Sequence, residues 1–399
     1  MSNNPTPVPA AADVFGHAVG EIRAAAAELW PGAEISLGQQ VPSVTGYVHR
    51  LAVDDRELYA KYSFLGVSLV SLLRGACGPW PNVLDSQRKY VERRDGLLAR
   101  EAAQLSHLAG VGRPQVCTVE GLARGVLLTR PVAGPTLADL MLADGADVAA
   151  LLGLAYAELH SLHHPPTSGR LRPATVIGER SIAGTFLRKF NGISGATYVG
   201  RLGAERCAAT DRQEVVAELR AAVAILHRLR TMTLPTSRPT LVYGDMKPEH
   251  VVFPDGLGAA PVFLDPGLLR AGASVDAAKL ASRTVLLLAA ARPGQDAGKR
   301  VAVGLGSFVE DVLRGRSRQA RTRWLRELLT LWLMDTTNIM TTYLSAPATL
   351  PLPRVGQQLV RRAVPVCRTL RRQADELAHS GDVLTVWERA LGAAEAVAA

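Results

Sequence analysis

The stretch LVYGDMKPEHVVF, residues 241–253, decides how this sequence is interpreted. Apolar, mostly β-branched residues stand on both sides of a short run that contains Asp245, Lys247 and His250. Gly244 permits an unusual backbone conformation directly before the aspartate, and a proline stiffens the loop after the lysine. The pattern predicts two short buried strands joined by a loop that presents charged groups.

A second acid follows in a similar setting. VFLDPG, residues 262–267, ends another short apolar run with Asp265. Two strands that each deliver a carboxylate at a turn fit a base and a metal ligand, the pair that phosphoryl transfer requires. The alternative is that both acids only cap turns. Spacing alone leaves both interpretations open.

The surrounding sequence predicts an α+β arrangement. Residues 34–63 have the pattern of three strands with tight turns, the last of them ending at Lys61. LLAREAAQLSHLA, residues 97–109, has helical periodicity, and two more strands are expected around 114–129. PVAGPT, residues 131–136, resembles a connector, and the sequence after it is mostly helical.

We therefore expect three parts. A disordered lead covers residues 1–15, a small β-rich lobe covers 16–130, and a large helical lobe covers 131–399. Within the small lobe, residues 64–96 form an insertion with the apolar run FLGVSLVSLL. That run either packs on the lobe or offers a surface to a protein partner.

Composition excludes several classes of protein. The chain has 399 residues, of which 48% are hydrophobic and 20% charged, as in ordinary globular proteins. No apolar run reaches the roughly 18 residues of a membrane span, and the N-terminus lacks a secretory pattern. We expect a cytoplasmic protein that has no membrane association. The four cysteines lie far apart without metal-ligand spacing, so we expect reduced thiols and no zinc site.

The basic charge bears on the partner. The net charge is +9, and Arg supplies most of the 45 basic residues. Arginine favours fixed contacts with phosphates and carboxylates, so a neutral or anionic partner fits better than a polycation. Aromatic residues make up only 5% of the chain and are not interleaved with the basic ones, so no nucleic-acid partner is expected.

These segments carry a resemblance to a known family. YGDMKPEHVVF followed by VFLDPG resembles the catalytic and metal-binding segments of the aminoglycoside phosphotransferase and choline kinase-like family, and the first is also similar to the catalytic loop of Ser/Thr protein kinases. VDAAKLASR and the upstream LLGLAYAELHSLHH extend the likeness. The resemblance implies a bilobal protein kinase-like fold, with a catalytic loop at 243–253 and a metal-binding segment at 263–276. It also implies ATP and Mg2+ as cofactors.

The family's roles carry over to matching positions. Asp245 would orient or accept the proton of the acceptor hydroxyl, and Lys247 would lie near the transferred phosphate. Asp265 would hold magnesium, and Asp276 would brace the catalytic loop. Lys61 would contact the inner phosphates.

The resemblance also implies how the nucleotide is held. Glu101 would pair with Lys61, and Glu92 is the competing partner. Further nucleotide contacts implied by the resemblance come from the loop residues Ser43, Thr45 and Gly46, and from backbone groups of the connector near Arg130 and Val132.

His250 departs from the family pattern, which usually has Asn at this position as an oxygen ligand. Imidazole nitrogen is a poorer ligand for Mg2+. Three interpretations stay open: His250 holds the loop while Asp265 binds the metal, or it favours Mn2+, or the second metal position is degraded.

The resemblance implies an ATP- and Mg-dependent kinase that phosphorylates a hydroxyl group. The acceptor is a natural-product-type small molecule, in biosynthesis or antibiotic resistance, or Ser or Thr of a precursor peptide in lanthipeptide-type dehydration. The alternative is a weakened kinase-like module that binds a nucleotide, a peptide or a partner protein without turnover.

Overall fold

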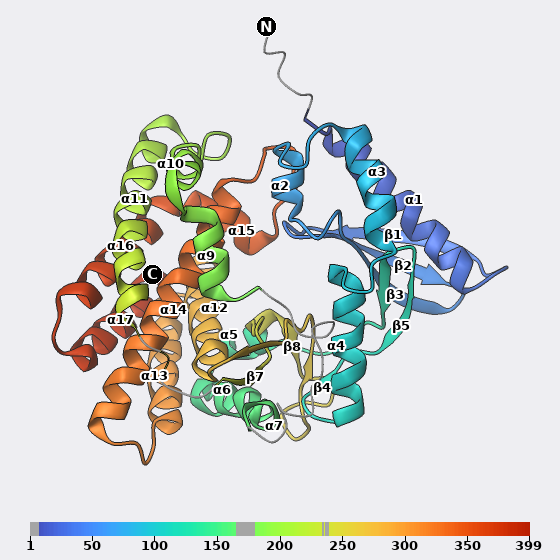
Figure 1. Ribbon diagram of the computed structural model, residues 1–399. Coiled ribbons are helices and arrows are strands. Elements are labelled where there is room, and N and C mark those ends of the chain that lie inside the picture. The colour runs from blue at the N-terminus through green and yellow to red at the C-terminus, as the bar shows by residue number, and fades with distance from the viewer. Residues whose placement is uncertain (1–7, 165–179, 234, 236–238) are drawn as a thin grey trace, which may run out of the picture.

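The computed structural model describes residues 8–164, 180–233, 235 and 239–399. A β-rich lobe and a helical lobe lie side by side (Figure 1). Residues 1–7 of the expected disordered lead lie outside the described residues. Residues 11–15 of that lead are helical, because helix α1 (Ala11–Leu29) begins there and buries Val14 completely. The small lobe therefore begins earlier than the sequence suggested.

The small lobe is built on a five-stranded sheet in the order β1-β2-β3-β6-β5. Alternating burial in β2 and β3 places every second side chain in the core, as expected for a sheet with one covered face. Asp54, with a φ of 50°, makes the tight turn between them. The strands are β1 (Ile35–Val41), β2 (Tyr47–Val53), β3 (Arg56–Tyr62), β5 (Val119–Ala123) and β6 (Val126–Thr129).

Helix α4 (Leu97–Val111) connects the sheet to the site. It contacts β5, β6 and the short strand β4 (Gln115–Val116). Gly112 ends it in the left-handed conformation with a φ of 83°, which a residue without a Cβ adopts at little cost. The helix thus presents one fixed face to β3, and that face carries Glu101.

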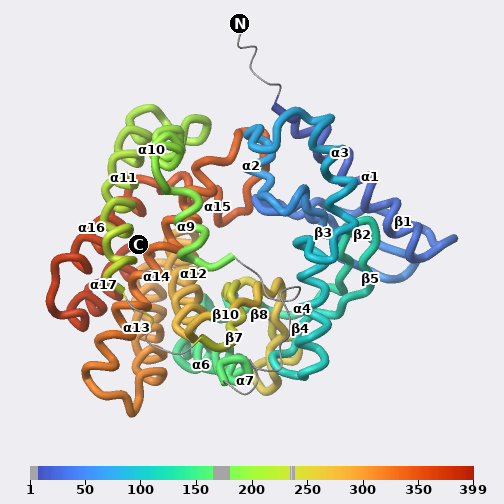
Figure 2. Tube along the Cα trace, viewed as in Figure 1, coloured from blue at the N-terminus to red at the C-terminus, as the bar shows by residue number. Residues whose placement is uncertain are grey.

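The insertion at 64–96 forms helices α2 (Leu69–Leu73) and α3 (Trp80–Val91). Four of the five α2 side chains are buried, so the apolar run packs on the protein. This was the first of the two expectations for the run. The same segment also contacts the large lobe. Arg74 donates to the carbonyl of Ser345 and lies 3.6 Å from a carboxylate oxygen of Glu205. The tube in Figure 2 shows α2 beside the segment that leads into α15 (Arg354–Arg361).

The large lobe is a helical bundle around two long buried helices, α12 and α14, which contact each other extensively. The helices are α5 (Leu137–Leu142), α6 (Val148–Ala157), α7 (His160–His163), α9 (Ile182–Phe190), α10 (Gly192–Gly200), α11 (Ala209–Met232), α12 (Ser274–Ala291), α13 (Gln295–Val312), α14 (Arg318–Leu344), α15 (Arg354–Arg361), α16 (Ala363–His379) and α17 (Val383–Ala398). None of the helices in the described part of the chain combines the length and the apolar composition of a membrane span.

Short strands hold the two acid-bearing loops between the lobes. Strand β7 (Thr240–Val242) pairs with β10 (Leu269–Ala271), and β8 (Val251–Val252) pairs with β9 (Val262–Phe263). β9 also pairs in parallel with β4, which precedes the sheet strands β5 and β6 in the chain. The loops that follow β7 and β9 are therefore fixed at the junction of the two lobes.

Candidate active site

Lys61 and Glu101 form a direct ion pair across the small lobe. The Lys61 ammonium lies 2.6 Å from Glu101 Oε1 and also bonds to Asp265 Oδ1. Burial alone would lower the pKa of Lys61, but the two carboxylates outweigh it and hold that pKa above its usual value. Lys61 is therefore charged. Glu92, the competing partner, is exposed just after α3.

Asp265 follows β9 in a strained backbone conformation. Its φ of 56° lies in the left-handed region, which non-glycine residues seldom adopt. Burial favours the neutral acid, yet Lys61 and then the nearby His250 and Lys247 hold the pKa of Asp265 below its usual value. A carboxylate that stays ionised at this position is a hard oxygen ligand for a divalent cation.

His250 lies at the end of a short 3-10 helix, Pro248–His250, directly beside Asp265. Its Nδ1 is 3.4 Å from Asp265 Oδ2 and, within the described residues, is a buried atom without a hydrogen-bond partner. Burial and the neighbouring Lys247 lower the pKa of His250, so the ring is neutral at neutral pH. We call Lys61, Glu101, Asp265 and His250 the Lys61 cluster.

This donor set fits one divalent cation. An unpartnered imidazole nitrogen beside an ionised carboxylate offers two ligands, and substrate phosphates and water commonly complete the coordination of Mg2+. Nitrogen suits Mn2+ better than Mg2+. No three His, Cys, Asp or Glu side chains gather into a metal-binding group in the ranges that the structure describes, so the protein offers no closed cage there.

Asp245 is surrounded by cations. Its carboxylate lies 2.7 Å from the Lys247 ammonium and 3.1 Å from that of Lys279. Burial alone would raise the pKa of Asp245, but Lys247, Lys279 and then Arg283 hold it well below its usual range. Gly244 sets the turn before it, with a φ of 81° and no room for a Cβ, which would lie 2.1 Å from the Gly267 carbonyl oxygen.

Asp276 holds the start of the loop that carries Asp245 in place. It is fully buried on α12, and its two carboxylate oxygens accept the backbone N–H groups of Tyr243 at 2.8 Å and Gly244 at 2.7 Å. His163, from α7, lies 3.0 Å from the same carboxylate. The bracing position that the resemblance implied for Asp276 is therefore matched by its contacts. His163 was visible in the LHSLHH run, although no role was assigned to it.

Three residues around Asp245 escaped the sequence analysis. Lys279 also lies 3.2 Å from an oxygen of Asp335, and Arg283 donates to the other oxygen of Asp335 at 2.9 Å. Lys279 and Arg283 are four residues apart on α12 and so share one face. That spacing was a usable signal, whereas no local pattern singles out Asp335 within α14. The Asp245 cluster comprises Asp245, Lys247, Lys279, Arg283 and Asp335.

Comparison with known proteins decides the family. A model of the phosphotransferase enzyme family matches residues 85–315, more than half of the chain. The chain belongs to the phosphotransferase enzyme family. A comparison with curated proteins gave no match.

Solved structures of phosphotransferases are similar in fold. The aminoglycoside phosphotransferase APH(4)-Ia, as a thermostable mutant in a ternary complex with ADP and hygromycin B, is 11% identical, with 89% of this chain and 97% of that chain covered and a TM-score of 0.50. An aminoglycoside-3'-phosphotransferase of type VIII is 21% identical, with 79% and 99% covered and a TM-score of 0.41. An ethanolamine kinase of Plasmodium vivax is 10% identical, with 92% and 83% covered and a TM-score of 0.42. The bilobal kinase-like fold expected from the sequence is confirmed.

The loop that we expect to cover the phosphates of the nucleotide lies between β1 and β2. Its Ser43 hydroxyl accepts the N–H groups of Thr45 at 3.3 Å and Gly46 at 3.5 Å. These bonds organise the turn itself and leave the Thr45 hydroxyl 3.3 Å from that of Ser43. The loop is ordered as a turn, and its contact with phosphates stays a prediction.

The connector differs from the expectation at Arg130. Its backbone N–H donates to the carbonyl of Thr118 at 2.9 Å, and its side chain pairs with Glu120 at 2.7 Å. The Arg130 N–H is therefore not free for a nucleotide base. Val132 packs against a separate, buried apolar cluster, and its contact with a nucleotide base stays a prediction. The cluster is Leu98, Ala102, Leu105, Cys117 and Leu127.

Proposed function

We propose that this chain is an ATP- and Mg-dependent phosphotransferase that transfers the terminal phosphoryl group to a hydroxyl of a small molecule. The observation that carries the proposal is that contacts with other elements hold both loops in place, the one that carries Asp265 and the one that carries Asp245. Asp265 is fixed by Lys61 and thereby by Glu101, while Asp245 follows a loop start that Asp276 braces. A chain that only bound a partner would not need both arrangements.

The residues divide the work of the reaction. Lys61 contacts the inner phosphates, and Glu101 keeps its ammonium in place. Asp265, with His250 beside it, would hold Mg2+, and a bound ion would supply positive charge that offsets the charge of the phosphates. Lys247 lies near the transferred group, and Asp245 accepts a hydrogen bond from the acceptor hydroxyl and directs its oxygen towards the phosphorus. Because the pKa of Asp245 is held low, its main role is to orient the hydroxyl.

The charge around Asp245 indicates which charge the acceptor molecule has. The Asp245 cluster holds three cations and two carboxylates, so its net charge is positive. A polycationic acceptor would be repelled there, whereas a neutral or anionic one would not. We therefore favour a neutral or anionic small molecule in the cytoplasm as the acceptor.

An acceptor screen tests the proposal. Purified protein is incubated with ATP and Mg2+ or Mn2+ against neutral, anionic and cationic alcohols and Ser/Thr peptides, and products are identified by mass spectrometry. We expect phosphorylated products among the neutral or anionic small molecules. Tight ADP binding without transfer to any hydroxyl would identify a binding module instead, and transfer to peptides alone would identify a peptide kinase.

A further inference from the structure

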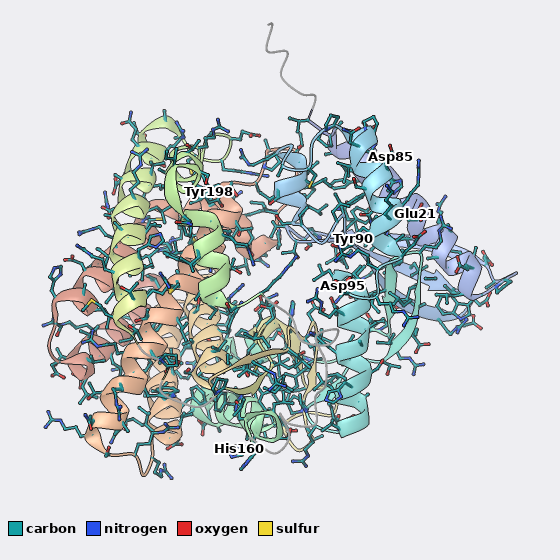
Figure 3. All side chains as sticks on the ribbon, viewed as in Figure 1. Glu21, Asp85, Tyr90, Asp95, His160 and Tyr198 are labelled. Atoms are coloured by element: carbon teal, nitrogen blue, oxygen red, sulfur yellow. The ribbon has the colours of Figure 1, made fainter. Side chains whose placement is uncertain are left out.

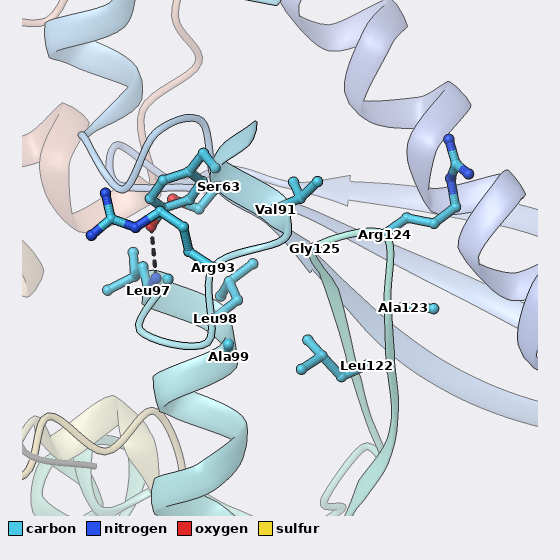
Figure 4. A pocket seen from close by; sticks show the side chains of 12 residues that line it. Ser63, Val91, Arg93, Leu97, Leu98, Ala99, Leu122, Ala123, Arg124 and Gly125 are labelled. Carbon is cyan, nitrogen blue, oxygen red and sulfur yellow. Dashed lines mark hydrogen bonds between the residues drawn. The ribbon is translucent and has the colours of Figure 1, made fainter. Parts of the chain in front are cut away.

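A cavity on the small lobe lies at the first turn of α4, the helix that carries Glu101. Its volume is about 150 Å3, and its walls come from Ser63 directly after β3, from α3, α4 and the loop between them, and from the end of β5 with the β5–β6 turn. Figure 4 shows Val91, Leu98 and Leu122 around this space, with Arg124 pointing away from it. Leu122 is 41% exposed, so the cavity opens to solvent on that side. A cavity of about 150 Å3 accommodates a molecule as large as benzene.

The cavity also carries hydrogen-bond donors. Gly96 caps α4 without a side chain, so the cap residue itself supplies no oxygen to the helix start. Tyr90 Oη accepts the N–H of Leu97 at 2.7 Å, and the next two residues, Leu98 and Ala99, line the cavity within the first turn. N–H groups in this position attract anions, because they combine unpaired donors with the positive end of the helix dipole.

Ser63 is the second, independent sign of a ligand. Its side chain lines the cavity, is 3% exposed, and its hydroxyl has no hydrogen-bond partner within the described residues. A buried hydroxyl without a partner is unfavourable, so it calls for an unseen acceptor. Ser63 lies two residues beyond Lys61, directly after the end of β3. The two arginines of the rim already have partners, since Arg93 binds Asp95 and Arg124 binds Glu21.

We propose that this cavity binds a small apolar molecule with one carboxylate. The carboxylate accepts hydrogen bonds from Ser63 Oγ and the first turn of α4, and the apolar part lies among Val91, Leu98 and Leu122. Glu101 is one helical turn beyond Leu97, so an occupant of the cavity stabilises the α4 position that pairs Glu101 with Lys61. Figure 3 labels Tyr90 and Asp95 close to this first turn.

Coupling to the nucleotide follows from this position and rests on the proposed function. If nucleotide binding requires the Lys61–Glu101 pair, the carboxylate ligand raises nucleotide affinity, and the nucleotide raises ligand affinity by the same factor. Binding of a carboxylate to the cavity does not depend on catalysis. An experiment can therefore refute the carboxylate site and the proposed function independently of each other.

The experiment uses benzoate as the probe and benzyl alcohol as its neutral analogue, with binding measured by ligand-observed NMR on the full chain. We expect saturable benzoate binding that weakens about tenfold in Ser63→Ala, because a hydrogen bond to a charged group is lost. Benzyl alcohol should bind at least about tenfold more weakly than benzoate. Two cavity-filling variants, Ala99→Trp and Leu122→Trp, should abolish binding.

The matched control is Ala109→Trp, which adds the same side chain to an exposed position further along α4. It should bind benzoate as the wild type does. Benzoate binding that persists in both filling variants, equal binding of benzyl alcohol, or no saturable binding in the wild type would each overturn the proposal. A benzoate site with no effect on ADP affinity would leave the binding site standing and remove only the coupling.

Discussion

The Lys61 cluster and the Asp245 cluster are both largely buried, yet they have opposite charge. The first places one ammonium between two carboxylates beside a neutral imidazole. The second places three cations around two carboxylates. Burial penalises every one of these charges, so each cluster persists only because its members are paired. The excess charge that remains in each cluster indicates what it attracts: a divalent cation in the first and an anionic or neutral group in the second.

Asp265→Asn removes a carboxylate from the Lys61 cluster. Of the three substitutions that test the difference between the two clusters, it should lower turnover most. It removes the negative charge that binds the metal, and we expect Mn2+ affinity and turnover to fall by about 100- to 1000-fold. Mn2+ binding followed by electron paramagnetic resonance measures the first effect directly. Asp255→Asn, an exposed acid nearby in the chain, is the control. Unchanged Mn2+ affinity in Asp265→Asn would show that the metal is held elsewhere.

Lys279→Met tests the Asp245 cluster through a pH profile. Lys279 helps to keep the pKa of Asp245 well below its usual range, so the wild type should show no loss of activity from Asp245 down to about pH 5. Removing this ammonium raises the pKa of Asp245, so the acidic limb of kcat/KM moves to higher pH. We also expect the plateau to fall by about tenfold.

Lys299→Met is the matched control, since Lys299 is exposed on α13. A lower plateau with an unshifted acidic limb would mean that Lys279 only supports the packing of α12 against α14. In that case the positive charge of the cluster has no part in setting the state of Asp245.

His250→Asn should have the smallest effect and the opposite sign. Asparagine supplies an oxygen where the neutral imidazole has an unpartnered nitrogen, so Mg-dependent turnover should rise by a few-fold, about 2- to 5-fold, and the preference for Mn2+ should decline. Steady-state assays with each metal measure this ratio. His160→Asn, at the exposed start of α7 in Figure 3, is the control. A fall in Mg-dependent turnover would give His250 a role of its own.

Much of the Lys61 cluster could be predicted from the sequence because its members belong to local patterns. Lys61 is the residue before the last in an alternating strand, and Glu101 lies in a periodic helix. The loop residues Asp265 and His250 each stand beside an apolar strand. Motif and periodicity therefore identified these residues before their contacts were known.

Only Asp245 and Lys247 of the Asp245 cluster were predicted, because the contacts of the cluster join distant helices. Lys279 and Arg283 lie on α12, and Asp335 lies more than fifty residues further along in α14. Nothing in local sequence shows which face of one helix meets which face of another. The hydrogen bond from the Arg130 N–H could not be predicted either, since its acceptor, the carbonyl of Thr118, belongs to another segment.

One helix boundary in the large lobe has a local cause. Helix α15 ends at Arg361 and α16 begins at Ala363. Pro365 cannot donate to the carbonyl four residues earlier, and its ring crowds that carbonyl. Arg362 lies at this break, between α15 and α16. Its side chain donates to the carbonyls of Ala289 in α12 and Val397 in α17, so it links both helices to the break.

The most direct test of phosphoryl transfer at this site compares Asp245→Ala with Asp255→Ala for both ADP affinity and metal-dependent ATP turnover. We expect Asp245→Ala to bind ADP within about threefold of the wild type while turnover falls by about 100- to 10,000-fold, and Asp255→Ala to change neither. Turnover that survives in Asp245→Ala would contradict the assignment of Asp245 as the residue that orients the acceptor hydroxyl.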